Sequence, residues 1–505
     1  MKTRFLTILL CLCLLVGLLP VSAAAEAQDA VDISNVDLIT ASEGFSSPKA
    51  LFDGHLLSGK ATTGNASLTL EYAEGIGSLY FLFDIPYGAF TITDNNTGNV
   101  HTAGTEGFLH DFVDLTAAFG TAPTSVTILF EQGSVKLYEL YVYTEGNVPE
   151  SVQKWKAPAD GQTDLVLFSA HGDDEQLFFA GVLPYYAGEL GYQVQVVYLT
   201  DHRADTPERI HEMLNGLWAV GVSAYPVFGT SPDFIIKNDI ALTYAVYKAR
   251  GYSREDLLSF VVENLRRFKP LVAVTHDVNG EYGHGMHMVY ADLLMEAVTT
   301  ANDASFHPES AETFGLWDTP KTYLHLYEEN PIVMDWDQPL ANFDGMTAFE
   351  VTQQLGYPCH VSQFRDFAWY HSYVKTAKEV TQYNPCYYGL FRSTVGEDVQ
   401  KNDFFENLIS YAEQARIAEE QRLEDERLAA EEEARRLEEA RLAEEARLAA
   451  EEAQRQAELA AAEAARAAEE AARQRTVRMA AAISAVLAAL LSFILLRRKT
   501  KQSKS

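Results

Sequence analysis

The sequence predicts a multidomain protein in which an N-terminal all-β sandwich precedes an α/β domain, and a long helix leads into a transmembrane helix. Three observations predict this order. Short apolar runs separated by Gly, Asn and Asp fill residues 30–148, as in a β-sandwich. Buried-strand runs alternate with helical runs over residues 163–398, which is typical of a mainly parallel sheet with covering helices. Residues 402–475 are dominated by Ala, Glu, Arg and Leu without Gly or Pro, which favours a long solvated helix.

The two ends of the chain indicate export and anchoring. Residues 1–27 combine a short basic start, an apolar core and closing small residues, the pattern of a secretory signal peptide. Residues 479–496 form an apolar run without charge, which as a helix spans roughly 27 Å and can cross a membrane. The basic residues 497–505 should then stay in the cytoplasm. Between these ends, the body of the protein is expected outside the cell membrane.

The composition excludes one class of partner. The chain of 505 residues has 71 acidic and 39 basic side chains and a formal charge of −32. Such a surface is repelled by phosphate backbones, so we expect no nucleic-acid partner.

Two cysteines, Cys359 and Cys386, remain after the signal peptide. A disulfide between them and two free thiols are both compatible with the sequence.

The segments that join the folded parts have their own composition. Residues 149–162 form a polar, Pro-containing linker. The stalk of residues 402–475 fits a spacer that holds the body away from the membrane. Its leucines do not keep a strict heptad, so a dimerising coiled coil is the less favoured alternative.

The strongest chemical signal is the run Ser-Ala-His-Gly-Asp-Asp-Glu at residues 169–175. It follows a buried strand, and α/β folds bind ligands at the carboxyl ends of their strands. Three adjacent carboxylates beside His171 repel one another, and a divalent cation would offset this repulsion. An acidic helix N-terminus stabilised by the helix dipole is the alternative interpretation.

A second cluster follows the buried strand that ends at Thr275. It offers a set of polar side chains in a Gly-rich loop: His276, Asp277, Glu281, Tyr282, His284 and His287. His284 and His287 would share one face of a helix beginning there. Because both clusters end strands of one sheet, they can converge on a single ion as an open catalytic zinc site.

These motifs resemble those of the PIG-L/LmbE family of zinc-dependent N-deacetylases. The family's Ala-His-Pro-Asp-Asp-Glu run appears as Ala170 to Glu175, and its His-x-x-His appears as His284 to His287. The resemblance covers residues 163–395 and implies a Rossmann-like α/β domain that binds Zn²⁺. It implies a hydrolase that removes the N-acetyl group of an N-acetylated sugar by cleaving a linear amide.

The resemblance also implies roles for single residues. The zinc ligands fall on His171, Asp174 and His287, and the general base falls on Asp173. Two more catalytic groups fall on His284 and Tyr282, and a substrate-facing arginine on Arg209, which begins an Arg-x-x-Glu motif with Glu212.

Two positions depart from the family pattern. Gly172 replaces a proline, and Met286 replaces an acidic residue that could orient a histidine. Neither change removes a ligand or the base, so the sequence predicts an active enzyme.

The β-domain leaves a further possibility open. Residues 30–148 resemble a discoidin or carbohydrate-binding jelly roll, notably at Ala50 to Gly54, which would give the domain a glycan ligand. A surface adhesin with a non-catalytic α/β domain is therefore the alternative function, and hydrolysis of another amide is a third.

Overall fold

The computed structural model describes residues 28–55, 60–62, 64–158, 160–200, 202, 207–363 and 374–502. The predicted signal peptide, residues 1–27, lies outside the described residues. The chain divides into two compact units between Gln414 and Ala415, which are taken separately below.

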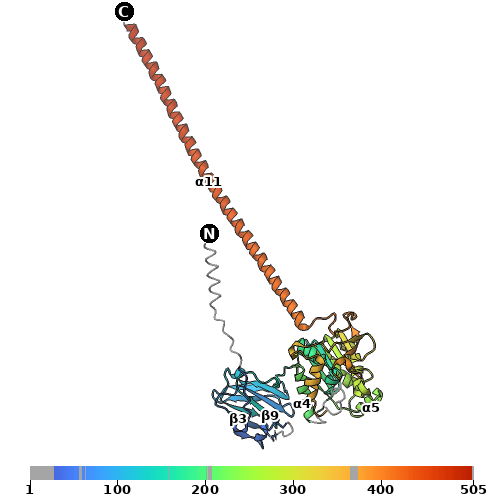
Figure 1. The fold of residues 1–505 in the computed structure, drawn as a ribbon. Coiled ribbons are helices and arrows are strands. Elements are labelled where there is room, and N and C mark those ends of the chain that lie inside the picture. The colour runs from blue at the N-terminus through green and yellow to red at the C-terminus, as the bar shows by residue number, and fades with distance from the viewer. Residues whose placement is uncertain are drawn as a thin grey trace. The chain divides into compact units, whose positions relative to one another are not determined.

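The β-domain consists of two antiparallel sheets. One has the order β1 (Ile39–Glu43), β3 (Ala66–Glu71), β8 (Ser125–Phe130), β5 (Phe90–Asp94) and β6 (Val100–Ala103). The other has the order β2 (Lys60–Ala61), β9 (Lys136–Tyr143), β4 (Ser78–Phe83) and β7 (His110–Asp114). Phe81 of β4 packs on Phe90 of β5 with ring centroids 5.0 Å apart, so side chains of both sheets share one core. Figure 1 shows these strands in blue.

Period-two alternation explains why these runs form strands. In β8, buried residues alternate with half-buried ones, as expected for a strand with one face on a core. The short helices of this domain are η1 (Val36–Leu38), η2 (Pro48–Phe52) and α2 (Leu115–Phe119).

The α/β domain is built on one seven-stranded sheet. Its order is β12 (Val227–Ser231), β11 (Val194–Thr200), β10 (Leu165–Ser169), β13 (Val272–Thr275), β14 (Lys321–His325), β16 (Tyr387–Ser393) and β15 (Pro331–Val333). The pairs from β12 to β14 are parallel, and β16 pairs antiparallel with both β14 and β15. The sheet is thus mainly parallel, with an antiparallel edge.

Both faces of this sheet are buried. In β10, Leu165 and Leu167 join one apolar cluster, whereas Val166 and Phe168 join another. A strand covered on both faces needs a continuous apolar run, which is why the sequence of β10 shows no alternation. The helical segments of this domain are α3 (Asp174–Leu177), η4 (Pro184–Glu189), α4 (Pro207–Ala219), α5 (Ile240–Ala249), α6 (Arg254–Phe268), η6 (Glu281–Gly283), α7 (Gly285–Thr300), α8 (Pro308–Phe314), η7 (Ala341–Phe343), α9 (Ala348–Val351), η8 (Thr352–Gly356), η9 (Tyr357–Cys359) and η10 (Ala377–Glu379).

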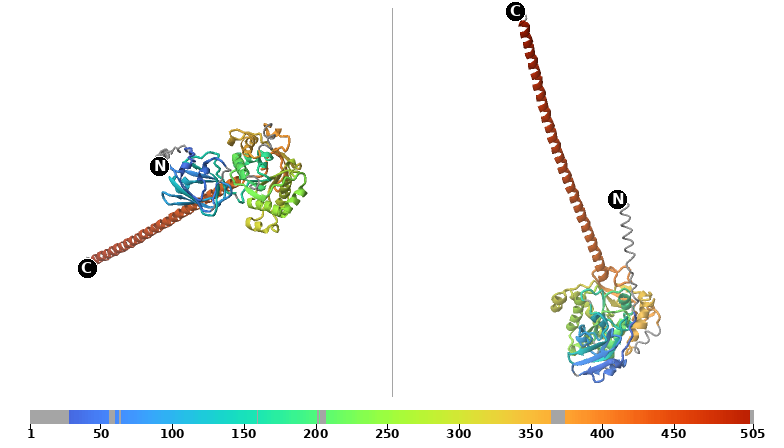
Figure 2. Two further views of the ribbon diagram at one scale, coloured as in Figure 1. Left: turned by 90° about the horizontal axis from the view of Figure 1, so that it is seen from below. Right: turned by 90° about the vertical axis from the view of Figure 1, so that its left-hand side faces the viewer.

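The long C-terminal helix, α11, spans Tyr411–Gln502 without interruption (Figure 2). It begins at Tyr411 and not at Asn402 as the sequence suggested. Phe404 and Phe405 are buried in the core of the α/β domain, so the residues before Tyr411 belong to that domain. By length and composition, α11 contains a stretch apolar enough to cross a membrane.

The two cysteines are both free thiols. Cys359 is half-buried, and Cys386 is buried in the core. Of the two alternatives that the sequence left open, the structure therefore has the free thiols.

Candidate metal centre and active site

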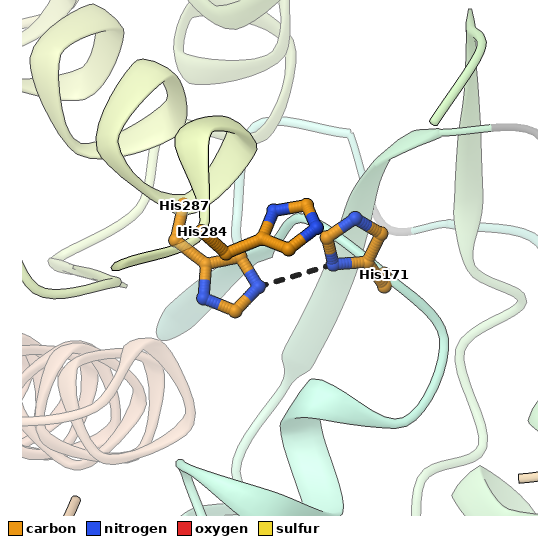
Figure 3. A group of neighbouring side chains, drawn as sticks. All are labelled: His171, His284 and His287. Atoms are coloured by element: carbon orange, nitrogen blue, oxygen red, sulfur yellow. Dashed lines mark hydrogen bonds between the residues drawn. The ribbon is translucent and has the colours of Figure 1, made fainter. Parts of the chain in front are cut away.

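Polar side chains gather where three parallel strands end. His171 follows β10, Asp233 follows β12, and the loop from His276 to His287 follows β13. In Figure 3, His171 faces His284 and His287, which project from the first turn of α7. The sheet topology thus brings together residues more than 100 positions apart in the sequence.

The three ligands predicted from the sequence converge on one point. His171 Nδ1 lies 3.0 Å from Asp174 Oδ2 and 3.1 Å from His287 Nε2, and His287 Nε2 lies 3.2 Å from Asp174 Oδ2. All three side chains are buried. Donor atoms about 2.0–2.2 Å from a tetrahedral zinc ion are roughly 3.3–3.5 Å apart, so these atoms need to separate by only a few tenths of an ångström. The residues therefore fit a divalent cation.

Two further carboxylates turn the histidine lone pairs toward this point. Asp233 Oδ1 is 3.3 Å from His171 Nε2, and Glu281 Oε2 is 2.7 Å from His287 Nδ1. If each carboxylate accepts the proton of the nitrogen it contacts, the opposite nitrogen of each ring keeps its lone pair for a metal. Carboxylates orient metal-binding histidines in this way in many metalloproteins.

His276 also lies close to the centre but is not available as a ligand. It forms a compact donor group with Asp174 and His287. Its Nε2 accepts a hydrogen bond from the Ala170 amide at 2.9 Å, and its Nδ1 lies 2.9 Å from Glu281 Oε2. Both ring nitrogens thus have partners within the protein, so His276 holds neighbouring groups in place and does not bind the metal.

The surrounding carboxylates create a field that favours positive charge. Burial alone would lower the pKa of His171, but Asp174 and Asp233 raise it to about 10. Burial alone would also lower the pKa of His287, but Asp174 and Glu281 raise it to about 9. A cation at the centre would meet the same field and displace these protons, since metal ligands must be deprotonated.

The predicted base lies beside the predicted ligands. Burial raises the pKa of the Asp173 carboxyl, and the Arg209 guanidinium opposes this shift. Arg209 Nη2 donates to Asp173 Oδ1 at 3.4 Å, and both residues are buried. The arginine predicted to face substrate therefore contacts the base directly.

His284 and Tyr282 lie beside the ligand His287, with ring centroids 4.8 Å and 5.4 Å from its ring. The amide of Met286 donates to His284 Nδ1 at 3.3 Å, so Nε2 carries the proton of the neutral ring. Burial lowers the pKa of His284 to about 3, which keeps the ring neutral. Tyr282 has left-handed backbone angles (φ 44°, ψ 24°), an unusual conformation for a bulky residue that often marks functional sites.

A polar cluster lies behind the base. Glu175 and His360 are completely or almost completely buried, and His360 Nε2 lies 3.4 Å from Glu175 Oε1. Within the described part of the chain, neither side chain has a well-aligned hydrogen bond. Ser362 Oγ donates to Glu212 Oε2 at 2.6 Å, so the Arg-x-x-Glu helix holds both the base and the segment that carries His360.

Several of these contacts were not predicted. Asp233 gave no signal in the sequence beyond its place after a strand, and His325 stands at the end of β14. His325 Nδ1 lies 2.6 Å from Glu281 Oε1, so Glu281 contacts three histidines. Glu281 belonged to the predicted cluster, but its role as their common partner depends on the folded loop.

Comparison with known proteins places this region in a family. The PIG-L family model, GlcNAc-PI de-N-acetylase, matches residues 166–298. Residues 166–298 form a PIG-L domain. This PIG-L domain contains both predicted motifs and the strands that carry them. The resemblance of residues 30–148 to a carbohydrate-binding module stays a prediction.

Relatives and solved structures are similar to the same part of the chain. A 1D-myo-inositol 2-acetamido-2-deoxy-alpha-D-glucopyranoside deacetylase 1 of Catenulispora acidiphila is 29% identical over 216 residues, which are 38% of this chain and 65% of the relative. A deacetylase of the same name from Rhodococcus erythropolis is 30% identical, over 33% of this chain and 62% of the relative. The chain thus spans less than two thirds of the length of these relatives. The N,N'-diacetylchitobiose deacetylase of Pyrococcus horikoshii aligns with a TM-score of 0.31 and 16% identity, over 41% of this chain and 73% of that one.

Proposed function

We propose that this protein is a zinc-dependent N-deacetylase that hydrolyses the N-acetyl group of an N-acetylhexosamine in a glycan or glycoconjugate. The observation that carries the proposal is the convergence of His171, Asp174 and His287 within 3.2 Å of one another, with Asp173 beside them. The match of the PIG-L family model to residues 166–298 supports the same reaction class.

His171, Asp174 and His287 would hold the zinc ion, which when bound acidifies water and polarises a carbonyl. The Asp173 carboxylate accepts a proton from the water that attacks the acetamide carbon. As the C–N bond breaks, this proton goes to the nitrogen, and the products are acetate and the free amine. Arg209 holds Asp173 through a direct hydrogen bond and keeps it oriented.

Two neutral donors face the developing oxyanion. His284 is neutral and carries its proton on Nε2, so it can donate without first gaining a proton. Burial raises the pKa of Tyr282, which keeps its hydroxyl protonated and able to donate. Donors fixed in a buried site stabilise a tetrahedral intermediate more than the ground state.

The substrate class is inferred from relatives by name and from the chemistry of the site. The relatives cited above are named as deacetylases of a 2-acetamido-2-deoxy-glucopyranoside. An N-acetylated amino sugar is therefore the substrate class that we propose for this chain.

We further propose that the protein is exported and anchored by α11, with the catalytic body outside the cell membrane and the C-terminus in the cytoplasm. Along α11, arginines pair with glutamates of the same helix; Arg422, for example, contacts both Glu419 and Glu426. Arg441 repeats the arrangement with Glu438 and Glu445. Such pairs stabilise a solvated helix and favour a spacer over a dimerising coil.

Acetate release by the full-length protein in detergent tests the proposed reaction. The substrates are a panel of N-acetylhexosamine mono- and oligosaccharides, supplied with and without a chelator. We expect zinc-dependent release from at least one, and Asp173→Asn should retain zinc while losing most activity. If zinc is bound stoichiometrically and no substrate yields acetate, the glycan-binding adhesin becomes the better account.

A further inference from the structure

The outer face of the sheet β2-β9-β4-β7 is unusually aromatic. In β4 and β9, Phe81 and Leu140 point into the core between the sheets, whereas Tyr80, Tyr141 and Tyr143 point away from it. The outer face of an antiparallel sheet is usually polar when it is solvated. The linker residue Val152 and His211 of α4 pack against parts of this face, and Tyr141 remains half-buried.

A pocket of 430 Å³ opens on the uncovered part. Its walls include Asp32, Tyr80, Tyr141, Tyr143, Ser151 and Asn215. This volume lies within the range of small-molecule sites, about 300–1,000 Å³. The pocket is formed by strands, linker and helix α4, and none of these six residues belongs to the metal centre.

Of the two neighbouring rings at the pocket, Tyr141 is half-buried, whereas Tyr80 is only 5% exposed. Tyr80 and Tyr141 are cross-strand neighbours with ring centroids 6.0 Å apart and planes at 33°. A cage for a quaternary ammonium ion would instead surround the cation with several ring faces. The accessible side of the Tyr141 ring can stack on the flat apolar face of a pyranose ring.

One hydroxyl at the pocket has no hydrogen-bond partner within the described part of the chain. Tyr143 is only 4% exposed, and no hydrogen bond of its hydroxyl occurs among the described residues. The Tyr80 hydroxyl, by contrast, lies 3.2 Å from His110 Nδ1. The Tyr143 hydroxyl is not among the completely buried side-chain atoms that lack a partner, so it is accessible from the pocket and can contact a ligand.

We propose that this pocket binds an uncharged sugar residue of a glycan, at a site separate from the metal centre. Tyr141 stacks on the ring, and Tyr143 and Asp32 hydrogen-bond to its hydroxyls. Among the six wall residues, Asp32 is the only charged one, so an anionic sugar is disfavoured. The proposal does not depend on the deacetylase activity.

Binding of neutral tetrasaccharides to the full-length protein tests this proposal. The protein carries Asp173→Asn so that nothing is hydrolysed, and it is treated with chelator so that the metal centre is empty. Cellotetraose, chitotetraose and choline are titrated by calorimetry up to about 10 mM, a range that reaches weak sugar affinities. We expect at least one tetrasaccharide to bind.

Matched variants locate the site. Tyr141→Ala should weaken binding at least about tenfold through loss of the stacking surface. Tyr143→Phe removes only the hydroxyl and should weaken binding roughly two- to tenfold. Tyr87→Phe, outside the pocket, is the control and should bind normally. Unchanged affinity in both pocket variants, absence of tetrasaccharide binding, or binding of choline alone would each overturn the proposal.

Discussion

Replacing Glu281 by Gln tests whether the buried carboxylate network supports the metal centre. Glu281 contacts His287 at 2.7 Å, His276 at 2.9 Å and His325 at 2.6 Å. The contact with His287 bears on a ligand, and loss of such a partner costs about 10- to 100-fold in metal affinity, or about 1.4–2.7 kcal/mol. The other two contacts bear on folding, because weakening the acceptor of a buried hydrogen-bond donor costs about 1–3 kcal/mol.

The assay separates these two effects. Zinc affinity is measured by competition with a chromophoric chelator, and the free energy of unfolding by denaturant titration of the metal-free protein. Glu350→Gln is the control, since Glu350 closes the capping box of α9 and does not touch the site. If Glu281→Gln binds zinc as tightly as the unchanged protein, Glu281 does not orient His287 and the reasoning fails.

Three further predictions concern pH, metal and the cluster behind the base. Burial lowers the pKa of His211 to about 4, so the unfolded state binds the proton more readily. The free energy of unfolding should therefore fall by on the order of 2 kcal/mol between pH 7 and pH 4.5. For His211→Gln, denaturant titrations at these two pH values should show a smaller fall. A chelator should lower the unfolding temperature and zinc should restore it, because a native-state ligand at 100 times its Kd adds about 2.7 kcal/mol; an unchanged midpoint in calorimetry would count against the metal centre. His360→Ala removes the imidazole that lies 3.4 Å from the buried Glu175 carboxyl and should destabilise the protein by about 1–3 kcal/mol, whereas Val361→Ala, at a side chain that is 72% exposed, should change little in the same denaturant titration.

Much of the fold could be predicted because local patterns agree with the tertiary structure. The short apolar runs predicted within residues 30–148 include those that form β4 and β8. The continuous apolar run of β10 predicted a strand buried on both faces, which its two clusters confirm. The helix start at Tyr411 could not be predicted, because residues 402–410 have helix-compatible composition and only the burial of Phe404 and Phe405 excludes them.

The candidate site also has residues that the sequence indicates and residues that only the folded structure brings together. His171 and Asp174 lie in one short motif at a strand end, so position in the sequence already indicated their proximity. Asp233 and His360 come from segments whose sequence carries no motif, and they reach the site only through tertiary packing. Residues of this kind orient or support others, and a pattern in one sequence does not mark them.

The two departures from the family pattern have physical explanations in this chain. A Cβ at Gly172 would lie 2.2 Å from Met213 Sδ and 2.3 Å from its Cγ. Met213 is completely buried, so a larger residue at position 172 would require close-packed atoms to move. Met286 removes a carboxylate beside the histidines, but Glu281 contacts His287, and Asp233 lies 3.3 Å from His171 and 3.8 Å from His284. Glu281 of the same loop and Asp233 of the loop after β12 therefore supply the negative charge near these rings, which is why the loss of one acidic residue from the motif leaves the predicted ligand set intact.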